Sequence, residues 1–234
     1  MSKHWEHEQV HQDSVVEKTE TILIWIKENR QLFFGTLTVV AAAGLIAIVM
    51  VSRANSMREA AWDRLFKAQQ LTYMGNTEEA NKTLDDIITN FSSTPASAHA
   101  KNFKAEYLYR QGKYKEAAEA FSVLAQTTNV KDMPVIALLG KAASYQGAGD
   151  FEKAIQAYTE AVSKAQDTPL LPFAKLSKAQ ALSEAGKNAE ALADFDQISK
   201  QFAETYWGQV AKEKVSPTKP AQAAPAPQTA KAKR

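Results

Sequence analysis

A period of 37 residues constrains this chain more than any other feature. Four glycines recur at that spacing: Gly75, Gly112, Gly149 and Gly186. An alanine stands seven residues before and five residues after each glycine, and a large apolar residue stands four before and nine after. Self-similarity at a period of about 20 to 50 residues is typical of solenoids and related arrays. The sequence therefore predicts four copies of one unit, stacked in a row.

Each unit is predicted to be a helix–turn–helix. A glycine ends the first helix in the left-handed conformation, which a residue with a Cβ resists. The second helix then begins near Asn76/Thr77, Lys113, Asp150 or Lys187. The alanines mark the points where two helices cross closely. They form two columns, Ala68, Ala105, Ala142, Ala179 and Ala80, Ala117, Ala154, Ala191. The large residues fill the space between units: Leu71, Leu108, Tyr145, Leu182 and Leu84, Phe121, Tyr158, Phe195.

The prolines of this region agree with the division into units. Pro95, Pro134, Pro169 and Pro172 all fall between units, where proline starts a helix and does not break one. No alternation typical of strands interrupts the pattern.

The combined pattern, Ala–x₂–Leu/Tyr–x₃–Gly–x₄–Ala–x₃–large apolar, resembles the tetratricopeptide repeat. The resemblance covers residues 56–202 and implies an all-α fold, a short right-handed solenoid of four helix pairs, with Tyr206–Val215 as a capping helix. The spacing of 37 residues exceeds the usual period of about 34, which suggests longer helices or turns.

One position departs from that family in every unit. The residue before the first alanine, usually leucine in the family, is a lysine, in the column Lys67, Lys104, Lys141 and Lys178. Equivalent positions line up in a solenoid, so the column forms either a basic ladder for an acidic partner or lipid headgroups, or four apolar stems with solvated charges. The second interpretation relies on neutralisation by nearby acids, Glu106, Glu116, Glu119, Glu152 and Glu184.

An uncharged run of twenty residues, Leu32–Val51, precedes the repeats. A helix of that length rises about 30 Å, which matches the hydrocarbon core of a bilayer, so the run predicts one transmembrane helix at 32–51. A buried soluble helix and a cleaved signal peptide are the alternatives. The 31 residues before the run are too many and too acidic for a signal peptide. Basic residues flank both ends about equally, so charge does not settle the orientation.

The rest of the chain divides around this run. Residues 1–31 form a short acidic segment with an amphipathic helix at 14–30 and an interfacial Trp25. Residues 52–214 hold the repeat domain. Residues 215–234 are rich in Pro, Ala and Lys, which predicts a disordered tail.

This layout resembles the YfgM family. The resemblance implies a single-pass bacterial inner-membrane protein with a cytoplasmic N-terminus and a periplasmic repeat domain. It further implies an ancillary subunit of the Sec translocon that cooperates with a membrane-anchored periplasmic chaperone and handles unfolded exported chains. The Pro/Ala/Lys tail is not a feature of that family as a whole.

No catalytic constellation is found in the sequence. The chain has no Cys, no Gly-rich phosphate loop and no metalloprotease or serine-hydrolase motif, so we expect neither an enzyme nor a cofactor. His99 is the only histidine in the repeats and has no catalytic partner at helical spacing. His4, His7 and His11 would share one helical face and could bind a transition metal, but a polar tail without a ligand is favoured.

Protein binding is therefore the predicted activity. In tetratricopeptide domains the first helices of the pairs line an inner groove. Carried over by register, the groove residues are Trp62, Leu65, Tyr73, Tyr109, Ile136, Leu139, Phe173 and Leu176. The alternative is that some of them lie in the core.

Two functions follow from this prediction. The first is a translocon subunit or chaperone for exported chains. The second is a non-catalytic scaffold for an envelope assembly machine such as a pilus, division or outer-membrane assembly system. No nucleic-acid partner is expected, because a net charge of only +2 is too small to argue for one.

Overall fold

The computed structural model describes residues 20–216, and these residues contain helices and no strand. The chain divides into two compact units, Met1–Met57 and Arg58–Arg234. Predictions that concern residues 1–19, including His4, His7 and His11, lie outside the described residues. So does the predicted tail, apart from Val215 and Ser216.

The first unit contains a long exposed apolar helix. Residues 20–28 are helical, a turn at Asn29 follows, and α2 then runs from Arg30 to Tyr73, past the unit boundary. By length and composition, α2 is the one described helix that could cross a membrane, and none of its most apolar window is buried.

The two polar side chains within Leu32–Val51 are satisfied by their own helix. The Thr36 hydroxyl donates to the Leu32 carbonyl at 2.9 Å and the Thr38 hydroxyl to the Phe34 carbonyl at 2.7 Å. An unsatisfied polar group would be costly in hydrocarbon, so these bonds make the run compatible with a lipid environment.

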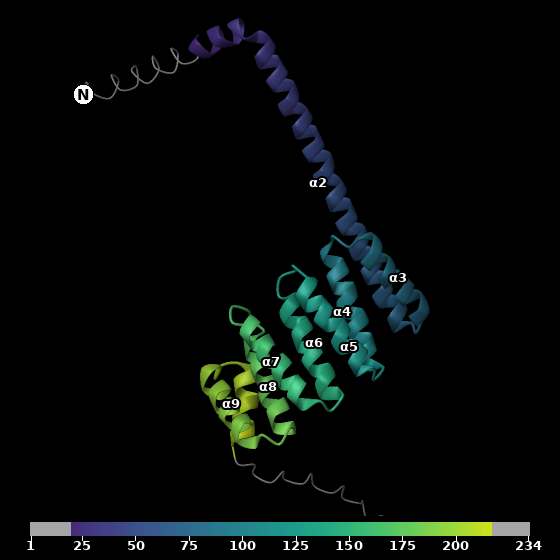
Figure 1. Ribbon diagram of the computed structural model, residues 1–234, viewed down its shortest axis with the longest axis vertical. Helices are drawn as coiled ribbons and strands as arrows, with labels where there is room; N and C mark the ends of the chain where they lie inside the picture. Colours follow the sequence, from purple (N-terminus) through teal and green to yellow (C-terminus); the bar gives the residue numbers. More distant parts are fainter. Residues whose placement is uncertain (1–19, 217–234) are drawn as a thin grey trace, which may run out of the picture. The chain divides into compact units, whose positions relative to one another are not determined.

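The second unit consists of helices that pack in chain order (Figure 1). After the Arg58–Tyr73 part of α2, they are α3 (Thr77–Asn90), α4 (Pro95–Arg110), α5 (Tyr114–Thr127), α6 (Met133–Gly147), α7 (Phe151–Lys164), α8 (Leu171–Glu184), α9 (Asn188–Gln201) and α10 (Tyr206–Val215). Four pairs, α2/α3 to α8/α9, precede the predicted capping helix, which is α10.

All four repeat glycines end a helix as predicted. Their φ angles lie between 74° and 81°, in the left-handed region. At Gly149 the amide donates to the Gln146 carbonyl, and the next amide, of Asp150, donates to Tyr145 at 2.9 Å. The same pair of bonds recurs at the other three glycines. Each glycine therefore satisfies the last carbonyls of one helix and starts the next within two residues.

The two alanine columns are buried between the packed helices. All eight predicted alanines are at most 2 % exposed. The column nine residues after the glycines is also buried, with Phe121 and Tyr158 among its members. An alanine at a crossing allows two helices to approach closely because it adds only a methyl group between them.

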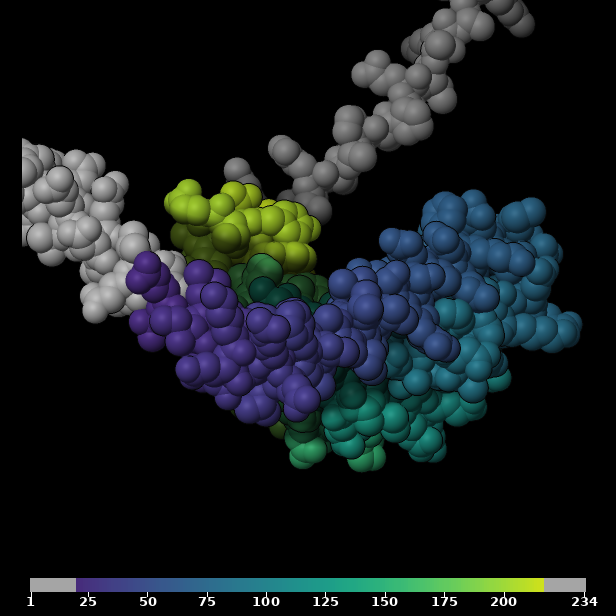
Figure 2. Space-filling view, turned by 90° about the horizontal axis from the view of Figure 1, so that it is seen from above, coloured from purple at the N-terminus to yellow at the C-terminus, as the bar shows by residue number. Residues whose placement is uncertain are grey.

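The core consists of four clusters, each made by one helix pair and the helix that follows it, which is the capping helix α10 in the last cluster. A solenoid has this quasi-one-dimensional core because each unit contacts only its neighbours. The pairs follow a curve: in Figure 2 the colours of the second unit run along an arc from blue α3 to yellow α9. The first helix α4 contacts the first helix α6, and the first helix α8 contacts the capping helix α10, whereas the second helices α3, α5, α7 and α9 make no comparable contact with one another. The first helices therefore form the inner side.

Every lysine of the Lys67, Lys104, Lys141 and Lys178 column is ion-paired. Lys178 donates to Asp194 at 2.8 Å, and Lys104 is paired with Asp85. Lys67 lies 3.6 Å from Glu79 and Lys141 lies 3.8 Å from Glu160. The partners come from second helices and are not the acids named from the sequence. Paired and partly exposed, these lysines contribute little to stability individually.

Replacing Gly149 by alanine should destabilise the solenoid by about 1 kcal/mol, because the left-handed conformation disfavours a Cβ while the added methyl group meets nothing within 4 Å. Gly149→Asn is the control, since asparagine tolerates this conformation better. Urea denaturation of the detergent-solubilised chain, followed by circular dichroism, should rank the midpoints as wild type, Asn, then Ala. Equal midpoints for Ala and wild type would show that the turn is not left-handed.

Candidate protein-binding groove

An apolar pocket lies on the inner side of the solenoid, where α4, α6 and α8 converge. Its volume is about 260 Å³. Tyr109, Ile136, Leu139 and Phe173 line it together with five residues that were not predicted, Asn102, Glu106, Phe121, Gly140 and Ala143. First helices supply eight of these nine residues. The pocket therefore lies on the inner side and is formed where successive first helices stack.

The floor of the pocket depends on one close approach. Phe121, on α5, is 3 % exposed, and its ring occupies the space next to the α6 backbone at Gly140. A Cβ built on Gly140 would lie 2.5 Å from the Phe121 ring. Phe66, Phe103 and Ser177 hold the equivalent position in the other units. Gly140 therefore lets Phe121, an aromatic residue of a second helix, reach the pocket on the inner side.

One polar group in the pocket wall has no partner. The Asn102 side chain donates through Nδ2 to Glu106 Oε1 at 2.7 Å, but its Oδ1 atom is buried without a hydrogen-bond partner. A buried acceptor that stays unpaired costs about 1–3 kcal/mol. Because Nδ2 donates to Glu106, the orientation of the amide is fixed, and Oδ1 is the atom that is left as an unpaired acceptor. The pocket thus offers an apolar surface with one fixed acceptor beside it.

Aromatic contacts flank the pocket along the inner side. The ring centroids of Trp62 and His99 lie 5.1 Å apart, those of Tyr109 and Tyr114 lie 5.3 Å apart, and those of Phe173 and Trp207 lie 5.1 Å apart. Partial burial lowers the pKa of His99 from its ordinary value. Burial therefore favours the neutral form of the His99 imidazole.

The predicted groove residues fall into three environments. Four of them, Trp62, Tyr109, Ile136 and Phe173, are partly exposed. Leu65, Leu139 and Leu176 are each less than 9 % exposed and belong to core clusters, although Leu139 also borders the pocket. Tyr73 ends α2 and is 93 % exposed. The pocket brings together Tyr109, Ile136, Leu139 and Phe173, and it does not include Trp62, Leu65, Tyr73 or Leu176.

Asn102 could have been found from the register. It occupies the same position as Leu65, Leu139 and Leu176, so it is a polar residue in an otherwise apolar column. Gly140 carries a similar signal, because phenylalanine stands at its position in the first two units. The contribution of Phe121 gave no such signal, since its column is predicted to lie in the core.

Metal binding finds no support in the described part of the chain. No group of three or more His, Asp or Glu side chains there could hold a metal ion.

The Tyr158 hydroxyl is the one strongly perturbed titratable group among the described residues. Burial raises its pKa above its ordinary value, and it donates to Gln146 Oε1 at 2.8 Å. A neutral phenol that donates to an amide is a structural group and not a catalytic base.

Comparisons with known proteins point to one repeat family. A family model described as a tetratricopeptide repeat matches residues 67–130 and 139–204, more than half of the chain. No curated protein matches the chain.

Among solved structures, the nearly identical TPR-like repeats of a Podosopora anserina protein described as a kinesin light chain are similar. They have a TM-score of 0.54 at 16 % identity, over 68 % of this chain and 84 % of that one. A point variant of that protein matches with the same TM-score at 15 % identity. Identity this low shows a common fold and nothing about partners.

Replacing Gly140 by alanine should destabilise the chain by about 1–3 kcal/mol, because the new methyl group overlaps the Phe121 ring. Phe121→Leu in the same chain should recover part of the loss, so the two changes should be non-additive. Urea denaturation of the single and double variants measures this coupling. Additive losses would mean that the ring does not pack against Gly140.

Proposed function

Because the chain belongs to the tetratricopeptide repeat family, we propose that its inner groove binds extended segments of other proteins. Tetratricopeptide repeats indicate a protein–protein interaction scaffold. The observation that carries the proposal is the apolar pocket with the unpaired Asn102 acceptor beside it. An apolar patch with a few fixed polar groups is the arrangement that binding sites use.

An extended peptide satisfies both features at once. An apolar side chain fills the space between Ile136 and Phe173, and a backbone amide of the peptide donates to Asn102 Oδ1. The backbone amides of an extended peptide are free to donate, whatever its sequence. The contact with Asn102 therefore selects for an extended backbone and not for a sequence. The first contact selects only for an apolar side chain. Such a site is expected to bind many segments weakly.

The membrane location of this activity is part of the proposal. Leu32–Val51 is proposed to span a bilayer once, supported by its uncharged sequence and by the internal bonds of Thr36 and Thr38. The anchor would confine the repeat domain to a layer next to the membrane. Confinement raises the effective concentration of partners there, so weak groove contacts suffice.

The resemblance to the YfgM family suggests where this takes place. We propose a bacterial inner-membrane protein with a cytoplasmic N-terminus and a periplasmic repeat domain, which acts as an ancillary translocon subunit or chaperone for exported chains. The alternative is a scaffold of an envelope assembly machine. A chaperone binds many unfolded chains, whereas a scaffold holds one partner in a stable stoichiometric complex.

Phe173→Ala should weaken binding of an unfolded probe, reduced and carboxymethylated lactalbumin, by about tenfold, because an aromatic anchor at an interface contributes about 1.4 kcal/mol or more. Fluorescence anisotropy of the labelled probe with the detergent-solubilised chain measures the dissociation constant.

Val123→Ala is the matched control, because Val123 is 58 % exposed on α5, a second helix away from the pocket. If both variants bind as wild type does, the groove is not the binding site. If wild type does not bind the probe but co-purifies with one partner, the scaffold alternative holds.

The proposed topology can be tested by single cysteines, because the natural chain has none. In intact cells with a permeabilised outer membrane, a membrane-impermeant maleimide should label Lys164→Cys and not Ser2→Cys. Both should react after detergent lysis. Labelling of Ser2→Cys and not of Lys164→Cys would reverse the orientation, and labelling of neither would place the repeat domain in the cytoplasm.

A further inference from the structure

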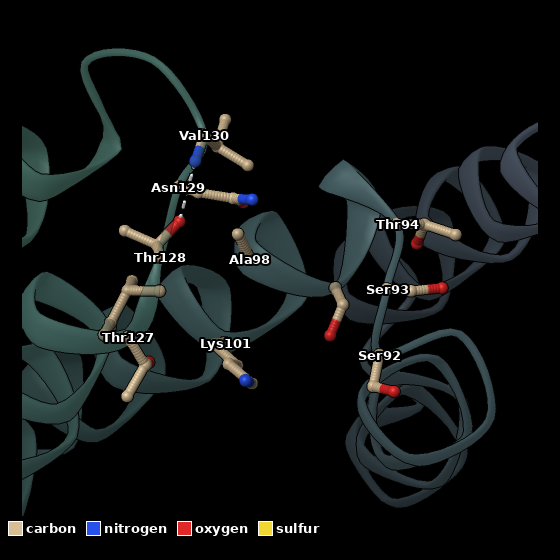
Figure 3. Close-up of a pocket in the computed structure, with 11 residues that line it drawn as sticks. Ser92, Ser93, Thr94, Ala98, Lys101, Thr127, Thr128, Asn129 and Val130 are labelled. Carbon is tan, nitrogen blue, oxygen red and sulfur yellow. Dashed lines mark hydrogen bonds between the residues drawn. The ribbon is translucent and has the colours of Figure 1, made fainter.

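A second pocket lies at the edge of the solenoid, between two connections that join successive helix pairs. Figure 3 shows Ser92–Thr94 of the α3–α4 connection on one side and Thr127–Val130 on the other, with Ala98 and Lys101 of α4 between them. The cavity measures about 380 Å³. It shares no residue with the apolar groove.

The lining of this pocket is rich in hydrogen-bonding side chains. Eight of its eleven residues carry one: Ser92, Ser93, Thr94, Ser97, Lys101, Thr127, Thr128 and Asn129. None of the eleven is acidic, and Lys101 supplies the only charge. Its character is therefore the opposite of that of the apolar groove, and it favours a polar, negatively charged ligand.

Ser97 is the most informative residue of the pocket. It is 1 % exposed, and its Oγ atom has no hydrogen-bond partner. A buried hydroxyl without a partner costs free energy, so packing alone does not explain it. Pro134, Leu171 and Gly208 hold the equivalent position in later units, which shows that the fold does not need a hydroxyl there.

Lys101 also differs from the basic residues at the equivalent position of other units. Arg64 and Lys175 hold the equivalent position in two other units, and both have partners: Arg64 pairs with Asp86 at 2.9 Å, and Lys175 donates to Gln201 at 2.7 Å. The Lys101 side chain has no ion pair or hydrogen bond to any of residues 20–216. Its ammonium group is thus available to a ligand.

The N-terminus of α4 adds partial positive charge at the same place. Helix α4 has sixteen residues, and no acidic residue stands in its first turn. The hydroxyl of its N-cap residue, Thr94, donates to the Phe91 carbonyl and does not cap the helix. The positive end of the helix dipole is therefore not offset by a side chain, and it favours an anion.

We propose that this pocket binds a phosphate group, either as the free ion or as part of a small phosphate ester. The Ser97 hydroxyl and the Lys101 ammonium group donate to its oxygens, and the dipole of α4 stabilises its charge. A phosphate presents more acceptor oxygens than a carboxylate, which suits a pocket with this many donors. The cavity volume lies at the lower end of the range for small-molecule sites, about 300–1,000 Å³.

Isothermal titration calorimetry of the full chain in detergent tests this directly, with inorganic phosphate and glycerol 3-phosphate as the two probes. Both should show saturable binding with one site per chain. Tighter binding of glycerol 3-phosphate would identify an ester as the ligand type, and equal binding would identify the ion itself.

Lys101→Gln and Ser97→Ala should each weaken binding about tenfold, as loss of a hydrogen bond to a charged group does. Lys175→Gln, at the equivalent position two units later, is the matched control and should bind as wild type does. Ser97→Ala should not lower the thermal unfolding midpoint in phosphate-free buffer, because the hydroxyl has no partner within the protein. Absence of saturable binding by wild type, or equal binding by wild type and Lys101→Gln, would overturn the proposal.

Discussion

Each pair of helices in this protein can pack closely because alanine stands at both crossings and glycine turns the chain between them. The eight alanines are buried, and the four glycines hold the left-handed conformation that ends one helix and starts the next. Because this pattern repeats every 37 residues, each pair packs on the previous one through equivalent residues. The curve of the solenoid and its inner side both follow from that repetition.

Local exceptions to the repeat create the sites. At Gly140 the repeat lacks a side chain, so Phe121 reaches the inner surface and becomes the floor of the apolar pocket. At Asn102 an amide replaces leucine and leaves an acceptor free. At Ser97 a hydroxyl replaces proline, leucine or glycine and is left without a partner. In a repeat protein the other units act as internal references, so a departure from the consensus points to a function more directly than burial does.

The sequence predicted the fold better than it predicted the groove. A period carried by Gly149 and its equivalents determines where helices end, because the left-handed turn is a local property of the backbone. Which side chains of a first helix face the groove depends on how that helix is rotated about its axis. The register of the repeat alone does not determine this rotation. Thus Leu65 and Leu176 are buried, while Phe173, three residues before Leu176, borders the pocket. The pairing of Lys104 with Asp85 was not predicted either, because it joins two units.

Site-specific photo-crosslinking in living cells tests the central claim, that the inner side of the solenoid holds other polypeptides. A photoreactive amino acid at Ile136, which lines the pocket, should capture other proteins. The same group at Val123, exposed on α5, should capture far fewer. Equal capture at the two positions, or none at Ile136, would contradict the account.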